Sequence, residues 1–127
     1  MVRSGSWSIR LGITHQSDGQ SYSSFCQAVT IPEDATRATL SFWYYPLSQD
    51  ALRYDWQRAI TYDHAWVVLD WAMPQVCSHC QTWTHHTFDL TPYKGQTIIV
   101  YFNVYNDGIG NRKTAMYLDD VLIQVCR

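Results

Sequence analysis

Two cysteines and two histidines lie close together in this chain and are the residues best suited to metal chemistry. Cys77 and Cys80 form a C-x2-C pair, and His85 and His86 follow after four residues, so the group contains four side chains that zinc accepts as ligands. Adjacent side chains of a strand point to opposite faces, so only one of the two histidines could join such a site. A Cys77–Cys80 disulfide, or two free thiols at a hairpin tip, explains the same residues without a metal. A redox role is not expected, because no helical pattern follows to lower a thiolate pKa.

Carboxylates are the second group that could do chemistry. Two of the three residues Asp55, Asp63 and Asp70 could in principle act as the carboxylate pair of a glycosidase. Their spacing in the sequence does not support such a pair, and positions in turns or at the rim of a sheet explain these residues equally well. The stretch "NDGIGN" at 106–111 has the composition of a cation-binding loop without the regular D-x-D-x-D pattern, which favours an ordinary turn. The sequence also contains no motif of a catalytic nucleophile or of a nucleotide-binding loop, so we expect the protein not to be an enzyme.

The last strand contains two adjacent acids, in "TAMYLDDVLIQVCR". Side chains alternate along a strand, so if one face is buried at least one of the carboxylates of Asp119 and Asp120 points inward. A buried carboxylate without a partner costs several kcal/mol or becomes protonated, so the inward one needs hydrogen-bond donors or a metal ion.

Composition excludes two classes of partner. The chain has 127 residues, a formal net charge of −2 and no run of Lys or Arg, so neither nucleic acid nor an anionic membrane surface is an expected partner. No apolar window is long enough to span a membrane, and no signal peptide is visible. Aromatic residues make up 15% of the chain and charged residues only 16%, so some aromatic side chains must be exposed, which usually indicates a ligand.

The elements that must position these residues are short strands. Apolar and aromatic runs alternate with Gly, Pro, Asp, Asn and Ser, and helical periodicity is nearly absent. Strands are predicted at 6–13, 25–31, 38–45, 64–72, 84–90, 96–105 and 115–125. The segment 52–62 fits a short helix or a strand extension. The sequence therefore predicts one all-β sandwich domain over residues 1–127.

Three motifs, in order and spread over nearly the whole chain, carry a resemblance: "FCQAVTIP…ATLSFWYY", "FDLTPYKGQTIIVYFNVYNDG" and "AMYLDDVLIQ". They resemble bacterial jelly-roll modules related to carbohydrate-binding modules and to the galactose-binding-like MAM domains. The resemblance implies a jelly-roll β-sandwich of two antiparallel sheets. Relatives usually open with an additional strand, and this chain begins directly at "RSGSWSIRL", so the family's first strand is expected to be lacking.

The jelly-roll order implies one sheet of 6–13, 96–105, 38–45 and 64–72, and a second of 115–125, 25–31 and 84–90. Alternation then turns Leu40, Phe42 and Trp7 inward, among others. The outer face of the first sheet is left with six candidate ligand-binding residues: Arg10, Trp43, Tyr45, Tyr101, Asn103 and Tyr105. Flat rings stack on the apolar face of a pyranose, and Arg or Asn takes its hydroxyls, so the face predicts a glycan ligand. Alternatively, these rings only cover the sheet or pack against a neighbouring domain.

The resemblance also implies that Asp119 is the inward carboxylate of the acidic pair, with Asp120 outward, and that a structural calcium ion is bound there. In such modules the first Asp of the Y-x-D-D-V motif often ligates calcium together with main-chain oxygens that precede the first strand, which here would be Asp119 and the region of Gly5. The alternative is that hydrogen bonds alone satisfy Asp119. The jelly-roll order further brings Cys26 and Cys126 onto neighbouring strands, where a disulfide could form. The sequence alone leaves three pairings of the four cysteines open.

The expected function is a non-catalytic carbohydrate-binding or adhesive module of an extracellular or cell-surface, multidomain bacterial protein. Its partners would be a glycan and neighbouring domains. A structural accessory domain is the alternative, packing on a partner such as a protease domain or forming a homodimer through the exposed edge of strand 115–125. A small hydrolase is the third class.

Overall fold

The computed structural model describes residues 2–5, 7–14, 19–51 and 54–127, and the regular secondary structure of these residues is almost entirely β-strand. The strands are β1 (Ile9–Gly12), β2 (Gln20–Thr30), β3 (Arg37–Ser48), β4 (Trp56–Asp63), β5 (Val68–Val76), β6 (Thr84–Asp89), β7 (Thr97–Asp107) and β8 (Thr114–Cys126). One turn of 3-10 helix, Thr91–Tyr93, precedes β7. Among the described residues, no helix is long and apolar enough to cross a membrane.

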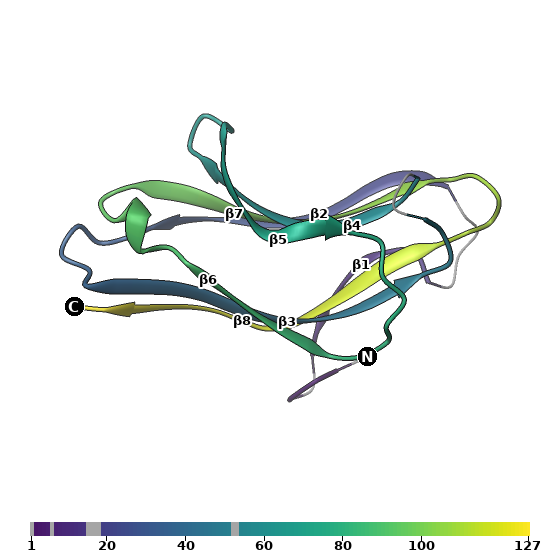
Figure 1. Ribbon diagram of the computed structural model, residues 1–127, viewed down its shortest axis with the longest axis horizontal. Helices are drawn as coiled ribbons and strands as arrows, with labels where there is room; N and C mark the ends of the chain where they lie inside the picture. Colours follow the sequence, from purple (N-terminus) through teal and green to yellow (C-terminus); the bar gives the residue numbers. More distant parts are fainter. Residues whose placement is uncertain (1, 6, 15–18, 52–53) are drawn as a thin grey trace.

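The strands form two layers that face each other (Figure 1). One layer, here called the β8 sheet, has the order β1-β8-β3-β6, and the other, the β7 sheet, has the order β2-β7-β4-β5. Every strand pair is antiparallel. The prediction of an all-β jelly-roll sandwich of two antiparallel sheets is confirmed.

The predicted division of strands between the sheets is wrong. Segments 6–13 and 38–45 were expected beside 96–105, but the structure pairs both β1 and β3 with β8. β7 pairs instead with β2 and with β4, and β4 contains residues 56–62 of the segment 52–62 that the sequence left undecided. Alternation fixes which face of a strand is apolar but not which strand lies beside it, so the pattern could not select these partners. Residues 6, 52 and 53 lie outside the described residues.

The core between the sheets follows the predicted alternation. Leu40 and Phe42 of β3 and Val100 and Phe102 of β7 are buried, and the rings of Phe42 and Phe102 meet edge to face across the two layers with centroids 4.9 Å apart. Trp7 was expected to join this core and does not, since it precedes β1 and is 85% exposed.

A bulge in β8 decides where the acidic pair lies. Trp43 pairs with Asp119 and Ser41 with Leu122, so two steps along β3 match three along β8. Asp120 sits in the extra position with a φ of 48°. Because Cα partners point to the same side of a sheet, Asp119 lies on the outer face with Trp43, and the predicted inward orientation is wrong.

Candidate functional site

The outer face of the β7 sheet carries a continuous group of aromatic side chains, which we call the platform. Strand register sets its central row, because Tyr105 of β7 pairs with Tyr22 of β2 on one side and with Trp56 of β4 on the other. Tyr62 and Trp71 come from β4 and β5, and the turn between these strands adds one more ring. The platform rings are Tyr22, Trp56, Tyr62, Trp66, Trp71, Tyr101 and Tyr105.

Ring contacts hold the platform in place. Trp56 and Tyr105 stack with centroids 4.3 Å apart and 28° between planes, and Tyr22 lies 4.5 Å from Tyr105. A second group meets at steeper angles, with Tyr62 and Trp66 5.4 Å apart and Tyr62 and Tyr101 5.6 Å apart. Every platform ring except Trp71 is therefore braced by another ring, and Trp71 lies near the Arg58 guanidinium instead, 6.0 Å from its central carbon. Such contacts restrict side-chain freedom in the free protein.

Arg58 and Asn103 lie within this face. Asn103 is fully buried, and its Oδ1 accepts hydrogen bonds from Arg58 Nε at 2.9 Å and from Trp56 Nε1 at 3.2 Å. Its Nδ2 donates to the carbonyl of Ser23 at 3.3 Å, which fixes the amide orientation. The Arg58 guanidinium carbon lies 5.3 Å from the Trp56 ring and 6.0 Å from that of Trp71. Asn103 thus positions its neighbours and is too deep to contact a ligand itself.

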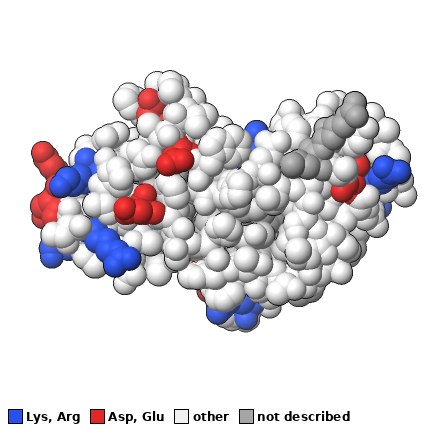
Figure 2. Space-filling view, viewed as in Figure 1, with Lys and Arg blue, Asp and Glu red and all other residues white. Residues whose placement is uncertain are grey.

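The β7 sheet that carries the platform is curved. The β7 sheet bows toward the other layer at its middle, and the turn between β4 and β5 rises above it (Figure 1). The upper outline of the molecule is accordingly hollowed, with few charged atoms around the hollow (Figure 2). Tyr22, Trp66 and Trp71 are 62%, 54% and 41% exposed, so the platform offers rings to solvent. By contrast, a groove of about 570 Å³ over Arg37, Thr87 and Asp89 has neither Trp nor Tyr in its lining.

The six predicted ligand-binding residues do not share one face. Tyr101, Asn103 and Tyr105 belong to the β7 sheet, whereas Trp43, Tyr45 and Arg10 belong to the β8 sheet on the opposite side of the sandwich. The prediction of a single face is wrong because it placed β3 beside β7. The platform residues that it missed are Tyr22, Trp56, Arg58, Tyr62 and Trp71. Alternation in "WQRAITY" could have found those of β4, had that segment been assigned to a strand.

On the β8 sheet the predicted rings are covered or dispersed. The Arg3 guanidinium lies 3.7 Å above the Trp43 ring, and His85 stacks against it at 4.8 Å. Tyr45 packs near Trp83, with centroids 5.5 Å apart. Arg10 is exposed, and its Nη1 donates to Thr14. Trp43 in particular has little free face to stack on a sugar.

The predicted zinc group is not assembled. His85 stacks on Trp43 on the outer face, while His86 stacks on Phe42 on the core side, as expected for adjacent strand residues. Within the described residues, neither Cys77 nor Cys80 belongs to any group of three or more metal-binding side chains.

All four cysteines are free. The Cys26–Cys126 disulfide suggested by the jelly-roll order is wrong, since β2 and β8 belong to different sheets. The Cys77–Cys80 alternative is also not formed. Cys77 instead lies 2.9 Å from Ser48 Oγ, and burial raises the pKa of its thiol.

Asp119 is satisfied by hydrogen bonds, which was the alternative to calcium. Its Oδ2 accepts from the backbone N–H groups of Arg3 and Ser4, at 2.9 and 3.1 Å, and its Oδ1 accepts from Asp120 N–H at 2.8 Å. Burial alone would raise the pKa of Asp119, but these N–H groups and the Arg3 charge outweigh it and hold the pKa below its usual value. A calcium ion needs oxygen ligands, so the predicted site at Asp119 and Gly5 does not fit the donors that the chain presents there.

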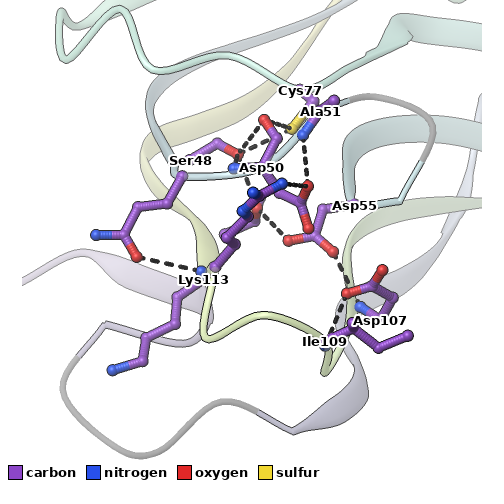
Figure 3. Close-up of polar contacts among 11 residues, drawn as sticks. Ser48, Asp50, Ala51, Asp55, Cys77, Asp107, Ile109 and Lys113 are labelled. Carbon is purple, nitrogen blue, oxygen red and sulfur yellow. Dashed lines mark hydrogen bonds and ion pairs between the residues drawn. The ribbon is translucent and has the colours of Figure 1, made fainter.

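A different acidic cluster could hold a metal ion. Asp50 follows β3, Asp55 precedes β4 and Asp107 ends β7, and one carboxylate oxygen of each lies within 4.8 Å of the others (Figure 3). Asp55 is fully buried and accepts from Thr114 Oγ1 at 2.6 Å and from Asp107 N–H at 2.9 Å. Burial raises the pKa of Asp55, and the nearby charges of Asp50 and Asp107 add to the increase. A cation would offset this repulsion.

The three carboxylates that the sequence offered for a glycosidase pair, Asp55, Asp63 and Asp70, all accept hydrogen bonds from nearby groups of the chain. Asp63 accepts from the N–H groups of Ala65 and Val67 and so closes the turn after β4, the structural role expected for it. Asp70 accepts from Trp71 N–H. Asp55 is fully buried in the cluster described above and has no open face toward a substrate.

Comparisons with known proteins bear on the fold. No protein-family model matches the chain, and no curated protein matches it. A solved structure of TmCBM61 in complex with β-1,4-galactotriose is similar, with a TM-score of 0.65 and 11% identity over 98% of this chain and 74% of that one. A structure from work on CBM4 structure and function gives a TM-score of 0.41 and 12% identity over 92% and 94%. The resemblance to jelly-roll carbohydrate-binding modules is thereby confirmed at the level of the fold.

Proposed function

We propose that this chain is a non-catalytic carbohydrate-binding module and that the platform on the β7 sheet is its binding face. The observation that carries the proposal is the row Tyr22, Tyr105 and Trp56, braced ring against ring on a concave outer surface. The similar structure of TmCBM61, which holds a galactotriose, supports the same class of ligand.

The chemistry of the platform fits a saccharide better than a fully apolar ligand. Exposed rings such as Tyr22 and Trp71 offer flat apolar faces on which the C–H face of a pyranose stacks. Arg58 supplies hydrogen-bond donors between the rings, and Tyr hydroxyls can both donate and accept. An open, elongated surface can bind internal sugar units of a polysaccharide as readily as its terminal units.

The setting of the module belongs to the same proposal. A binding module without catalysis serves a partner domain, so we place the chain in a multidomain protein that acts outside the cell or at its surface. We further propose that the cluster of Asp50, Asp55 and Asp107 holds a structural calcium ion, because three hard carboxylate oxygens are ligands that calcium prefers.

Affinity electrophoresis against a panel of neutral and acidic polysaccharides tests the binding face. Wild type is expected to be retarded by at least one polysaccharide, and Tyr22→Ala and Trp71→Ala are expected to lose most of that retardation. Trp7→Ala is the matched control, since Trp7 is 85% exposed and lies outside the platform. Retention lost in Trp43→Ala but kept in Trp71→Ala would move the site to the β8 sheet. No retention of wild type on any polysaccharide would sink the proposal.

The open edge of β8 favours a second candidate, self-association. β1 pairs only with residues 115–118 of β8, so residues 119–126 have no strand on that side among the described residues. Val121 and Leu122 are exposed there. An unpaired strand edge is a template for another strand. Analytical ultracentrifugation of wild type and Leu122→Lys would show a dimer that the substitution dissociates, whereas a monomer at high concentration would rule this out.

A further inference from the structure

Arg58 brings a positive charge to the platform, and no acidic side chain of the described residues forms an ion pair with it. The ion pairs between described residues join other groups: Arg3–Asp120, Arg112–Asp50 and Arg127–Asp34. Arg58 is partly buried between Trp56 and Trp71, where surrounding rings exclude part of the water that would otherwise solvate its charge. A cation in such a position gains most from a ligand of opposite charge.

Asn103 orients this cation without cancelling its charge. An aspartate at the same position could accept the two hydrogen bonds that Asn103 Oδ1 accepts from Arg58 and Trp56, and it would form a buried ion pair. The amide accepts the same bonds while remaining neutral, and its donation to Ser23 O keeps Oδ1 turned toward Arg58. The guanidinium is therefore held in one orientation with its charge intact.

The remaining donors of Arg58 form a fork. The Nε atom is used by Asn103, and no hydrogen bond between described residues uses Nη1 or Nη2. These two nitrogens lie in one plane and match the two oxygens of a carboxylate or sulfate. A single hydroxyl of a neutral sugar would use only part of this fork.

We infer that the platform selects glycans that carry an anionic group, the carboxylate of a uronic acid or a sulfate, and that Arg58 is the residue that recognises it. The inference rests on the proposed function, whose rings stack the sugars. It adds the class of saccharide, which the rings alone do not determine.

Isothermal titration calorimetry of the full chain tests this with three probes: trigalacturonate, a sulfated galactan oligosaccharide and neutral β-1,4-galactotriose. At least one anionic probe is expected to bind about tenfold tighter or more than the neutral probe at low salt, the factor that corresponds to about 1.4 kcal/mol. The advantage should shrink as salt is added. Tighter binding of trigalacturonate would indicate that Arg58 recognises a carboxylate, and tighter binding of the sulfated galactan would indicate a sulfate.

Two variants separate the role of the charge from that of the rings. Arg58→Gln is expected to remove the anionic preference and to change galactotriose affinity much less. Asn103→Asp should do the same by neutralising the guanidinium, and its thermal melt shows whether it folds. Trp7→Ala should leave all three affinities unchanged.

Equal affinities for the three probes in wild type, or equal losses for all three in Arg58→Gln, would overturn the inference and leave the proposed function standing. Binding of none of the three probes, together with no retention on the polysaccharide panel, would overturn both.

Discussion

At the residue scale, the hydrogen-bond donors around an aspartate determine whether its carboxylate needs a cation. Asp119 receives three backbone N–H groups and needs no cation. Asp55 receives one hydroxyl and one N–H and lies against two further carboxylates. Sequence alone could not distinguish the two carboxylates, because two of the three partners of Asp119, the N–H groups of Arg3 and Ser4, lie more than a hundred residues away in the chain.

Asp119 predicts a pH-dependent contribution to stability. Its folded pKa is lowered, so its contribution is present above about 3.9, the ordinary value of an aspartate, and is lost as the pH falls through the folded pKa. We expect Asp119→Asn to lower the free energy of unfolding at neutral pH by about 1–3 kcal/mol, with the difference narrowing in acid. Urea unfolding across pH measures this.

Asp120→Asn serves as the control for the Asp119 prediction. It removes a partly exposed ion pair to Arg3 and should cost at most about 1 kcal/mol. A larger loss at Asp120 than at Asp119, or an Asp119→Asn difference that does not change with pH, would contradict the role given to the N–H groups.

At the element scale, the attachment of β1 to β8 depends on a glycine. Gly12 has a φ of +90°, and a Cβ there would lie 2.2 Å from the Thr114 carbonyl oxygen and 2.8 Å from Ala115 Cα. Gly110 has a similar φ of +75° but only the flexible Arg112 side chain nearby. An alanine at Gly110 would therefore test backbone strain alone, whereas an alanine at Gly12 would add a steric collision to the same strain.

We expect Gly110→Ala to lower the free energy of unfolding by about 1–2 kcal/mol, because alanine is strained in a left-handed conformation. We expect Gly12→Ala to lower it clearly more. The collision partners of Gly12 are backbone atoms of β8, so β1 would have to move away. Thermal melts of the two variants compare them directly. Equal losses would show that β1 is not held as closely as the structure indicates.

The elements also show how far the sequence could go. Alternation correctly selected the buried faces of β3 and β7, because those faces are uniformly apolar. It failed at Asp119, where the bulge at Asp120 exchanges the two faces of β8. It also failed to assign neighbours, since a strand of the right pattern can pair with several others.

At the scale of the whole molecule, three of the six predicted ligand-binding residues lie on the sheet that carries the candidate site. Tyr101 and Tyr105 were assigned to a ligand face from their strand alone, and they lie on the platform. Tyr22 and Trp56 come from strands that only the three-dimensional order places beside β7. The fold class needed only the spacing of strands and turns, whereas the site needed their arrangement.

A calcium ion at the acidic cluster would stabilise the whole molecule. It would join the ends of β3 and β7 to the start of β4, so binding to the native state alone should raise the melting temperature. We expect calcium to raise the melting temperature of EDTA-treated wild type and to leave the melting temperature of the Asp50→Asn variant unchanged. Magnesium at the same concentration is the control for ionic strength. No difference between calcium and EDTA in wild type would exclude the ion.

The central claim, that glycans bind on the β7 sheet, is tested most directly by the indole N–H signals of the six tryptophans in a two-dimensional NMR spectrum. On titration with a retained oligosaccharide, we predict that the signals of Trp56, Trp66 and Trp71 shift while those of Trp7 and Trp43 stay in place. Shifts at Trp43 without shifts at the platform tryptophans, or no shift with any oligosaccharide, would contradict the account.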